Sequence, residues 1–356
     1  MVAFPFQISK SFLGIDIGTS SVKLIELSKV GSRLKLENYG EIGASTFYEG
    51  PFRTFEKNTL LLSTTDVAKA ILAIIDEAKI QTKNVIFSIP DFSSFFTNFE
   101  LPPMSQNELD QAVRFAARQH IPLPLGEVTI DWQVIKGRII GKKGTKLRVL
   151  LVAVPNEVIA QYQEISNLTN LQFRAMEAET FGLVRSLVHD SAKLRIIIDI
   201  GAQSTTVTVV DGKVLQISHS LDVAGNEFTR VLSKSLNVDY REAELMKRMK
   251  ENDKTVKKVS DIITPLVDLI MAETWKIAEE YKEVESKEIE EIIIAGGSAN
   301  LVGIKEKWYE KFKKEIIIAN PFSPLFYPPI LEEALREMGP SYAVAVGMAE
   351  RGLEQL

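Results

Sequence analysis

Apolar residues along the chain recur in two spacings, one typical of short buried strands and the other of amphipathic helices. In the first part of the chain they predict three strands, a loop, a helix and a further strand. These segments are expected near residues 12–17, 21–28, 33–42, 43–58, 66–79 and 84–89.

The pattern changes at Pro90, where a second group of elements begins. A Phe-rich strand over 94–101 leads into Ser105-Gln106-Asn107-Glu108, a capping box that predicts a helix running to about Gln119. Two strands, another helix and a last strand are expected near residues 128–136, 146–154, 157–169 and 171–178. The order strand, helix, strand, strand, helix, strand indicates a compact inserted module.

A second lobe is expected from Leu194 onward, with strands, then a mostly helical stretch over 225–285, and then strands and helices again. A final helix of small residues, over 342–351, is predicted to begin after Pro340. The division predicted from these patterns is a first-lobe core (1–90), an inserted interaction subdomain (91–174), a connecting helix (175–193), a second-lobe core (194–224), a helical subdomain (225–290), the rest of the second-lobe core (291–340) and a final helix returning to the first lobe (341–356).

Composition excludes several kinds of site. The 356 residues carry a formal charge of −5, which argues against a nucleic-acid binder, since phosphate contacts need a basic face. There is no cysteine and there are only three histidines, so disulfides, thiolate nucleophiles and His- or Cys-ligated metals are not expected. No stretch approaches the ~18 consecutive apolar residues that span a bilayer, and the first residues lack a basic leader. We therefore expect a cytoplasmic protein.

Two stretches, 13–23 and 195–206, resemble each other. Each is an apolar strand that ends in Asp-Ile-Gly and continues into small hydroxyl residues and a second β-rich run. Turns of this kind expose backbone N–H groups to anions, and glycine leaves room for a phosphate. Two of them indicate related lobes facing each other across a nucleotide. The candidate phosphate-binding residues are Asp16, Gly18, Thr19, Ser20, Ser21, Lys23, Asp199, Gly201, Ala202, Gln203, Ser204, Thr205 and Thr206.

The carboxylates of Asp16 and Asp199 are the candidate Mg²⁺ ligands, acting through waters because Mg²⁺ keeps much of its hydration shell. Lys23 is expected to neutralise phosphate charge. A third element follows another buried strand, where Gly-Gly before a helix lets a flat base or ribose approach the backbone. It consists of Gly296, Gly297, Ser298 and Asn300.

The order of first phosphate turn, connecting helix, second phosphate turn and adenosine turn resembles the actin, sugar-kinase and chaperone-type ATPase superfamily. The resemblance implies an α/β, actin-like two-lobe (ribonuclease H-like) fold that binds ATP and Mg²⁺. It also implies that a connecting helix near 175–183 carries the residue that orients an attacking water. Glu177 and Glu179 are both candidates for that catalytic role, and a solvated helix start is an equally good interpretation of either.

Within that superfamily the chain resembles the PilM family of type IV pilus assembly proteins, which is similar to the cell-division protein FtsA. The similar segments are FELPPMSQNELDQAVRFAARQHIPLPLGEVTIDWQVI (99–135), VLLVAVPNEVIAQY (149–162), MEAETFGLVRSL (176–187) and AGNEFTRVLSKSLNVDYREAELMK (224–247). Carried over by position, the resemblance places Gly225 and Asn226 near phosphate, and Glu244 and Lys247 near ribose and adenine. Unlike FtsA, the sequence shows no amphipathic membrane tail after the last predicted helix.

The resemblance implies an ATP-binding scaffold with at most slow ATPase activity. Its expected partner is the N-terminal cytoplasmic peptide of PilN, which would hold it at the inner membrane, and it would meet the pilus platform and motor ATPases indirectly. Homo-oligomerisation stays open. The expected peptide groove lies between the first lobe and the inserted module and involves Phe92, Phe95, Phe96, Phe99 and the IPLPL segment 121–125. Most of these Phe residues are expected in the core, and at most one or two of them should face the groove. The alternatives are an FtsA-like filament-forming protein and a small-molecule kinase.

Overall fold

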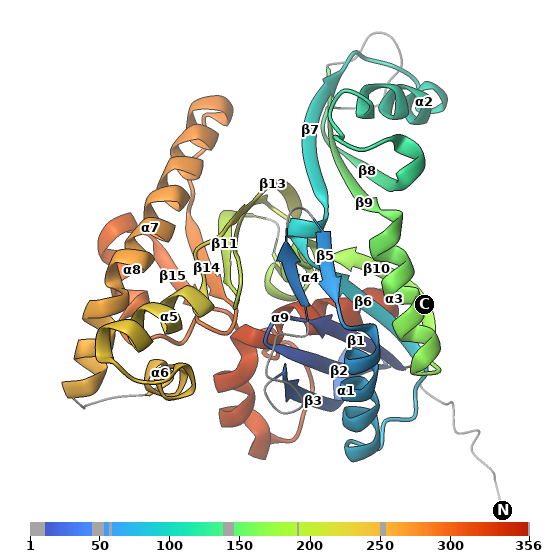
Figure 1. The fold of residues 1–356 in the computed structure, drawn as a ribbon. Helices are drawn as coiled ribbons and strands as arrows, with labels where there is room; N and C mark the ends of the chain where they lie inside the picture. The colour runs from blue at the N-terminus through green and yellow to red at the C-terminus, as the bar shows by residue number, and fades with distance from the viewer. Residues whose placement is uncertain are drawn as a thin grey trace, which may run out of the picture.

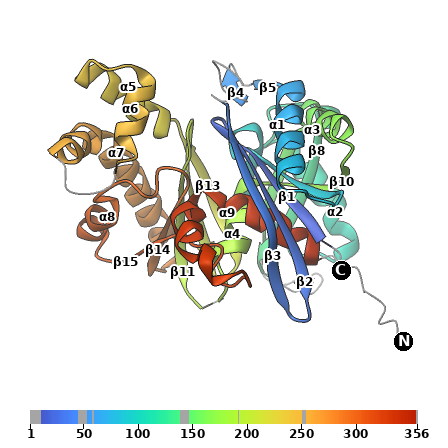
Figure 2. The same cartoon turned by 90° about the horizontal axis from the view of Figure 1, so that it is seen from below.

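The computed structural model places two α/β lobes side by side, with two helices passing between them (Figures 1 and 2). It describes residues 11–44, 53–56, 59–137, 146–190, 192–249 and 254–354. The first ten residues and the last two, on which the expectations about a leader and a tail rest, lie outside these ranges. Most of the predicted loop 43–58 also lies outside the described ranges. Its described part contains a strand, Arg53–Glu56, that we did not predict.

The first lobe is built on a five-stranded sheet in the order β10-β6-β1-β2-β3. Alternating apolar positions of β1 give it two buried faces: Leu13, Ile15 and Ile17 pack with α1 and α3, whereas Phe12 packs with the helices between the lobes. The elements of this lobe are β1 (Ser11–Ile17), β2 (Ser21–Val30), β3 (Arg33–Gly43), β4 (Arg53–Glu56), β5 (Thr59–Leu62), α1 (Thr64–Glu77), β6 (Asn84–Ile89), α3 (Asn156–Leu168) and β10 (Gln172–Ala178).

A three-stranded sheet in the order β7-β9-β8 projects from the first lobe and carries one helix on one face (Figure 1). The predicted capping box is present: Ser105 and Glu108 exchange hydrogen bonds at the start of that helix. The elements of this inserted module are η2 (Asp91–Ser93), β7 (Phe95–Leu101), α2 (Gln106–Ala117), η3 (Leu125–Glu127), β8 (Val128–Lys136) and β9 (Leu147–Pro155).

The six predicted elements of the module do not form one sheet. Strand β10 pairs in parallel with β6 of the first lobe, and the core side chains of α3 pack in the same cluster as those of α1. The helix and strand that we placed last in the module therefore complete the sheet layer of the first lobe. Only β7, α2, β8 and β9 stand apart.

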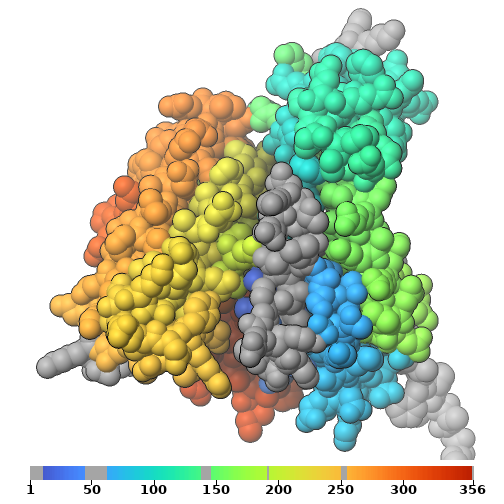
Figure 3. All heavy atoms as spheres, in the orientation of Figure 1, coloured from blue at the N-terminus to red at the C-terminus, as the bar shows by residue number. Residues whose placement is uncertain are grey.

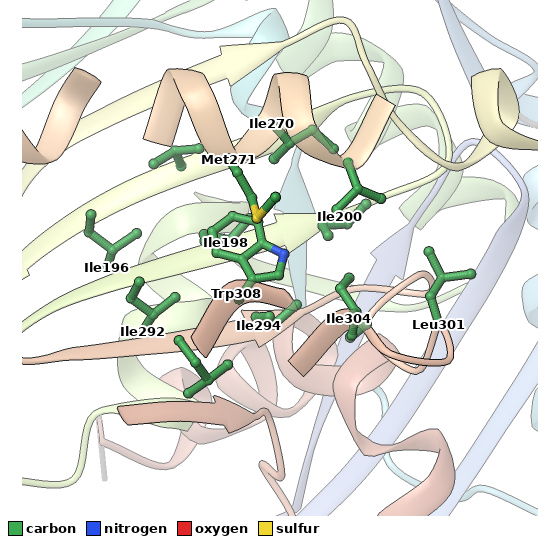
Figure 4. Close-up of a cluster of buried hydrophobic side chains, with 14 of the residues drawn as sticks. Ile196, Ile198, Ile200, Ile270, Met271, Ile292, Ile294, Leu301, Ile304 and Trp308 are labelled. Carbon is green, nitrogen blue, oxygen red and sulfur yellow. The ribbon is translucent and has the colours of Figure 1, made fainter. Parts of the chain in front are cut away.

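The second lobe has a sheet of the same plan, in the order β13-β12-β11-β14-β15. Its core is rich in isoleucine, and the fully buried Trp308 lies among Ile198, Ile294 and Met271 (Figure 4). The elements are β11 (Leu194–Ile200), β12 (Thr205–Asp211), β13 (Val214–Leu221), α5 (Gly225–Leu236), α6 (Tyr240–Lys247), α7 (Lys254–Glu285), β14 (Glu291–Ala295), α8 (Ile304–Phe312) and β15 (Glu315–Ile318).

Two helices, α4 (Glu179–Leu187) and α9 (Glu332–Glu354, preceded by η5, Pro329–Leu331), lie between the two sheets (Figure 2). They cross at Gly182 and Gly347, where the backbones touch: a Cβ on Gly347 would overlap the carbonyl of Gly182. Glycine is required at this crossing because no side chain fits between the helices.

Helix α9 begins before Pro340, not after it as we predicted. Pro340 lies inside the helix and lacks an N–H, so it cannot donate to the carbonyl of Arg336, four residues earlier. The N–H of Gly296 donates to the carbonyl of Pro340 (2.8 Å), and the Asn300 amide donates to that of Glu337 (2.7 Å). The loop after β14 thus contacts the helix next to the proline.

Candidate functional site

The first Asp-Ile-Gly turn joins β1 to β2. It is closed by a hydrogen bond from the N–H of Gly18 to the carbonyl of Ser21 (2.9 Å). Asp16 is buried and accepts a hydrogen bond from the Ser88 hydroxyl of β6 (2.8 Å), a partner that nothing in the sequence indicated. Lys23 lies opposite Asp16 in the β1–β2 register, and its Nζ donates to Ser21 Oγ (2.8 Å). A carboxylate and an ammonium group therefore flank this turn.

The second turn, between β11 and β12, has the same construction. The N–H of Gly201 donates to the carbonyl of Ser204 (3.1 Å), and a Cβ on either turn glycine would lie 2.9 Å from the carbonyl that closes the turn. The two turns meet, because Thr19 Oγ1 of the first donates to Gln203 Oε1 of the second (3.2 Å). The structure thus brings together two turns that lie 184 positions apart in the sequence.

The hydroxyl groups around these turns are not equivalent. Thr205 is fully buried and its Oγ1 donates to the carbonyl of Val223 (2.7 Å), so it points into the second lobe. Thr206 Oγ1 lies 3.4 Å from Ser220 Oγ, on the neighbouring strand. Ser20 is exposed, and Ser204 and Ala202 are half-buried at the turn itself.

The Gly296-Gly297 turn packs directly against the second phosphate turn. Gly296 has a φ of +88°, a conformation that side chains rarely adopt, and a Cβ there would lie 2.5 Å from Asp199 Oδ1. The N–H of Ser298 donates to the carbonyl of Ile200 (3.2 Å). Asn300 differs from the expectation, since its exposed amide is turned to α9 and not to the other turns.

The start of α5 completes this group. The N–H groups of Gly225 and Asn226 donate to the carbonyls of Gly201 (3.0 Å) and Ala202 (2.7 Å) of the second turn. A Cβ on Gly225 would lie 2.9 Å from Ser298 Oγ. The helix N-terminus, the second turn and the Gly-Gly turn are therefore in contact, and the first N–H groups of α5 hold the second turn in place.

Glu244 and Lys247 of α6 form an ion pair beside Gly225 (2.6 Å), and Thr229 of α5 contacts both side chains. Burial favours a higher pKa for Glu244, but the ion pair and the hydrogen bonds from Lys247 and Thr229 outweigh it, so that the pKa is lowered. Burial lowers the pKa of Lys247, against the opposing effect of Glu244. Lys247 also donates to the carbonyl of Gly225 (3.0 Å). Sequence reasoning missed Thr229, although it lies one helical turn after Gly225 and thus on the same face.

The two candidate catalytic carboxylates have different surroundings. Glu177 lies on strand β10, where Arg185 Nη1 (2.7 Å), Arg185 Nη2 (3.0 Å) and Arg351 Nε (3.1 Å) contact its oxygens. Glu179 is the first residue of α4 and is buried, with 9% of its surface exposed. Glu177 thus belongs to an ion-pair cluster, whereas Glu179 begins the helix between the lobes.

A cavity of about 580 Å³ lies between the inserted module, the first lobe and the edge of the second lobe. Its walls are mostly apolar, with a few charged groups. They include Asp131 and Gln133 of β8, Leu150, Val152 and Val154 of β9, Met176 of β10, Phe181 and Arg185 of α4, and Lys213 and Leu215 beside and on β13.

The cavity lies in the expected region, but other residues line it. Phe95 and Phe99 pack in the core of the module, and Phe92 packs in the core of the first lobe. Phe96 is near the cavity, with its ring 6.3 Å from that of Phe181, and the 121–125 segment is absent from the walls. The sequence carried one sign of this cavity wall, in strand β9. Its consecutive apolar positions indicate a strand that is covered on both faces.

Among the described residues, no group of three or more His, Cys, Asp or Glu side chains lies close enough together to hold a metal ion. No helix among them combines the length and the apolar character that crossing a membrane requires.

The chain is similar to several known proteins. The family model of the type IV pilus assembly protein PilM matches residues 14–353. The cell division protein FtsA of Enterococcus hirae is 24% identical over 344 residues, covering 85% of this chain and 76% of FtsA.

Solved structures give the same picture of the fold. The PilM-PilN type IV pilus biogenesis complex contains a chain with a TM-score of 0.83 and 24% identity, covering 96% of this chain and 98% of that one. The ethanolamine utilization protein EutJ from Carboxydothermus hydrogenoformans has a TM-score of 0.59 at 13% identity, covering 98% of this chain and 92% of EutJ. These likenesses and the sheet topology confirm the predicted actin-like, two-lobe α/β fold.

Proposed function

This chain belongs to the family of the type IV pilus assembly protein PilM, and on that premise we propose that it is a nucleotide-binding scaffold of the pilus assembly platform. It docks the N-terminal cytoplasmic peptide of PilN and is thereby held at the inner membrane from the cytoplasmic side. The observation that carries this proposal is the apolar cavity between the first lobe and the inserted module, in a chain of this family.

The facing turns support the nucleotide part of the proposal. Backbone N–H groups, glycine and small hydroxyl residues on both sides suit the phosphates of ATP. The Gly296 turn lies against the second turn, and the Glu244–Lys247 pair lies beside Gly225, where the ribose and base would be held. Asp16 and Asp199 suit Mg²⁺, which is typically bound by one or two carboxylates together with waters and substrate phosphates.

The surroundings of Glu177 count against it as the residue that orients a water. Both of its oxygens are engaged by arginines, so releasing it for another role would break a largely buried ion pair. Glu179, at the start of α4, is the other candidate. Slow or absent turnover is compatible with the scaffold role, in which ATP sets the angle between the lobes.

The cavity suits an extended, mainly apolar peptide. Its walls are formed by β-strands and one helix, so the site is largely pre-formed, and burial of apolar side chains provides affinity. Its charged groups are few, and Arg185 is held by Glu177 and Glu354. Indirect contact with motor ATPases would follow from PilN at the platform.

The first test is a calorimetric titration of the protein with a synthetic PilN-type N-terminal peptide. We expect saturable 1:1 binding. Val152→Glu places a charge in the half-buried cavity wall, so it should weaken binding by at least tenfold, because an unpaired carboxylate there must be desolvated.

The control is Val30→Glu, the same change at a β2 position that is 58% exposed and away from the cavity. It should leave peptide affinity unchanged. A folded wild-type protein that does not bind the peptide would refute the scaffold proposal and favour the FtsA-like interpretation.

A further inference from the structure

The inserted module belongs to the first lobe in sequence, yet it is also tied to the second lobe. At the C-terminal end of α7, Glu285 pairs with Arg148 of β9 and with Lys136 of β8 (2.5 Å). The Asn98 amide of β7 donates to the carbonyl of Gln216 of β13 (2.7 Å). All three strands of the module thus contact the second lobe, and Figure 3 shows the module beside the top of α7.

The Glu285 contact is enclosed. Only 7% of its side chain is exposed, as against 50% for Glu100, which pairs with Lys146 inside the module. Burial opposes ionisation of Glu285, but the hydrogen bonds from Lys136 and Arg148 outweigh it and lower its pKa. Separating the module from α7 would break both ion pairs at once and expose Glu285 to water.

One wall of the cavity comes from the second lobe. Lys213 and Leu215, beside and on β13, face the walls formed by β8, β9, β10 and α4. Leu215 is 3% exposed, and it is packed in none of the hydrophobic clusters of the two lobes or the module. A ligand that fills this cavity touches both lobes.

The nucleotide turns have the same property. The first turn belongs to one lobe and the second to the other, joined across the gap by Thr19 and Gln203. Two sites, both divided between the same two bodies, depend on one angle between those bodies. A ligand that contacts both lobes favours one angle between them, and two ligands that favour the same angle favour each other.

We infer that the peptide site is composite: the second lobe completes it through Lys213 and Leu215, so that peptide and nucleotide bind with positive cooperativity. This inference rests on the proposed function, since it concerns the same cavity. It adds that the second lobe is a recognition surface for the peptide, and that the peptide in turn raises the affinity for Mg·ATP.

The test measures the dissociation constant of the PilN-type peptide with and without saturating Mg·ATP, and that of Mg·ATP with and without peptide. In the wild type, each ligand should lower the dissociation constant of the other by the same factor, about fivefold or more. Leu215→Ala removes a second-lobe contact and should reduce this factor toward one. Lys213→Ala, at an exposed position, should do the same and guards against a folding defect in the first variant.

Met176→Ala is the matched control, because Met176 lines the same cavity from the first lobe. Met176→Ala should raise the dissociation constant of the peptide equally with and without nucleotide. The factor by which nucleotide lowers that constant should therefore stay unchanged. Peptide binding with a factor of one in the wild type overturns this inference and leaves the proposed function standing. Equal loss of the factor in the Met176 and Leu215 variants also overturns it, whereas absence of peptide binding refutes the proposed function itself.

Discussion

Gly296 is the residue at which the backbone of the candidate nucleotide site is most restricted. Its φ of +88° and its contact with Asp199 leave no room for a side chain. We expect Gly296→Ala to weaken Mg·ATP binding by at least tenfold, about 1.4 kcal/mol, because the methyl group must displace the Asp199 carboxylate or the turn. Calorimetric titration with Mg·ATP measures this.

Gly303→Ala is the control for backbone strain. Gly303 has a similar φ of +78° but no atom within 4 Å of the Cβ position. It should lose stability without losing nucleotide affinity. Equal affinity losses in both variants would mean that strain, and not the Asp199 contact, explains the effect.

Glu350 predicts a pH dependence of stability. It is 8% exposed on α9, and burial raises the pKa of its carboxyl to about 8, against a smaller opposing effect of Arg185. The folded protein therefore keeps the proton at pH values where the unfolded chain loses it. The free energy of unfolding should fall as pH rises from about 4.5 to about 8, by at most about 1.4 kcal/mol per unit.

Glu350→Gln removes this titration. The variant should match the wild type in thermal denaturation at pH 5 and melt at a higher temperature at pH 8. Glu333→Gln, on the exposed part of the same helix, controls for the loss of a negative charge. A melting difference that is the same at both pH values would contradict the assignment.

Single residues also show where sequence reasoning stopped. The two Asp-Ile-Gly turns were predicted to face each other, and the structure brings them into contact, although the roles of their residues stay predictions. The partner Ser88 was not predictable, because a hydroxyl in a strand carries no pattern, whereas the spacing of Thr229 from Gly225 on one helix was a signal that we missed. The arginines around Glu177 come from α4 and α9, and only the fold brings them together.

At the scale of elements, the crossing of α4 and α9 gives a prediction that runs against helix propensity. Replacing glycine by alanine inside a helix normally stabilises it by roughly 1 kcal/mol. At Gly347 we expect a loss of about 1–3 kcal/mol instead, since the added methyl overlaps Gly182 and forces the helices apart. Chemical denaturation of Gly347→Ala measures the change.

Gly339→Ala, in the same helix, is the comparison. Its Cβ would have ordinary contacts, the nearest at 3.4 Å from Pro321. Gly339 precedes Pro340, whose ring disfavours a helical residue with a Cβ, so some loss of stability is expected, but a smaller one than in Gly347→Ala. If Gly339→Ala loses as much stability as Gly347→Ala, the close crossing is not what requires Gly347.

Most elements could be predicted from the sequence, since apolar periodicity is local. Their pairing could not, and β10 shows why: its strand character is local, whereas its partner β6 lies far away in the chain. Pro340 misled the prediction of α9 because a proline usually lies at the start or the end of a helix, whereas this helix continues through it. A cavity lies in the region where we expect the peptide groove, and Phe92, Phe95 and Phe99 are core residues, as we expected for most of the Phe residues.

At the scale of the whole molecule, Glu285 links the module to the second lobe. We expect Glu285→Gln to weaken binding of the PilN-type peptide without nucleotide by about fivefold, because the lobes lose a contact that favours the binding arrangement. Saturating Mg·ATP should restore part of the affinity. Calorimetry under the two conditions measures both effects.

Glu100→Gln breaks the exposed ion pair within the module. It should change the peptide affinity neither without nor with Mg·ATP, since exposed pairs contribute little. If the two variants behave alike, the link between module and second lobe has no role in peptide binding.

The position of α9 has a consequence for the order in which the protein folds during synthesis. Its Ala345 and Ala349 backbone lies directly on Gly14 of β1, and its side chains cover one face of the first-lobe sheet. Yet α9 leaves the ribosome after every other element described here. The lobe that is made first therefore keeps an apolar sheet face uncovered until α9 has been made, whereas the lobe made second can bury its Trp308 core earlier. In the nascent chain, the N-terminal half is the one that needs protection from aggregation.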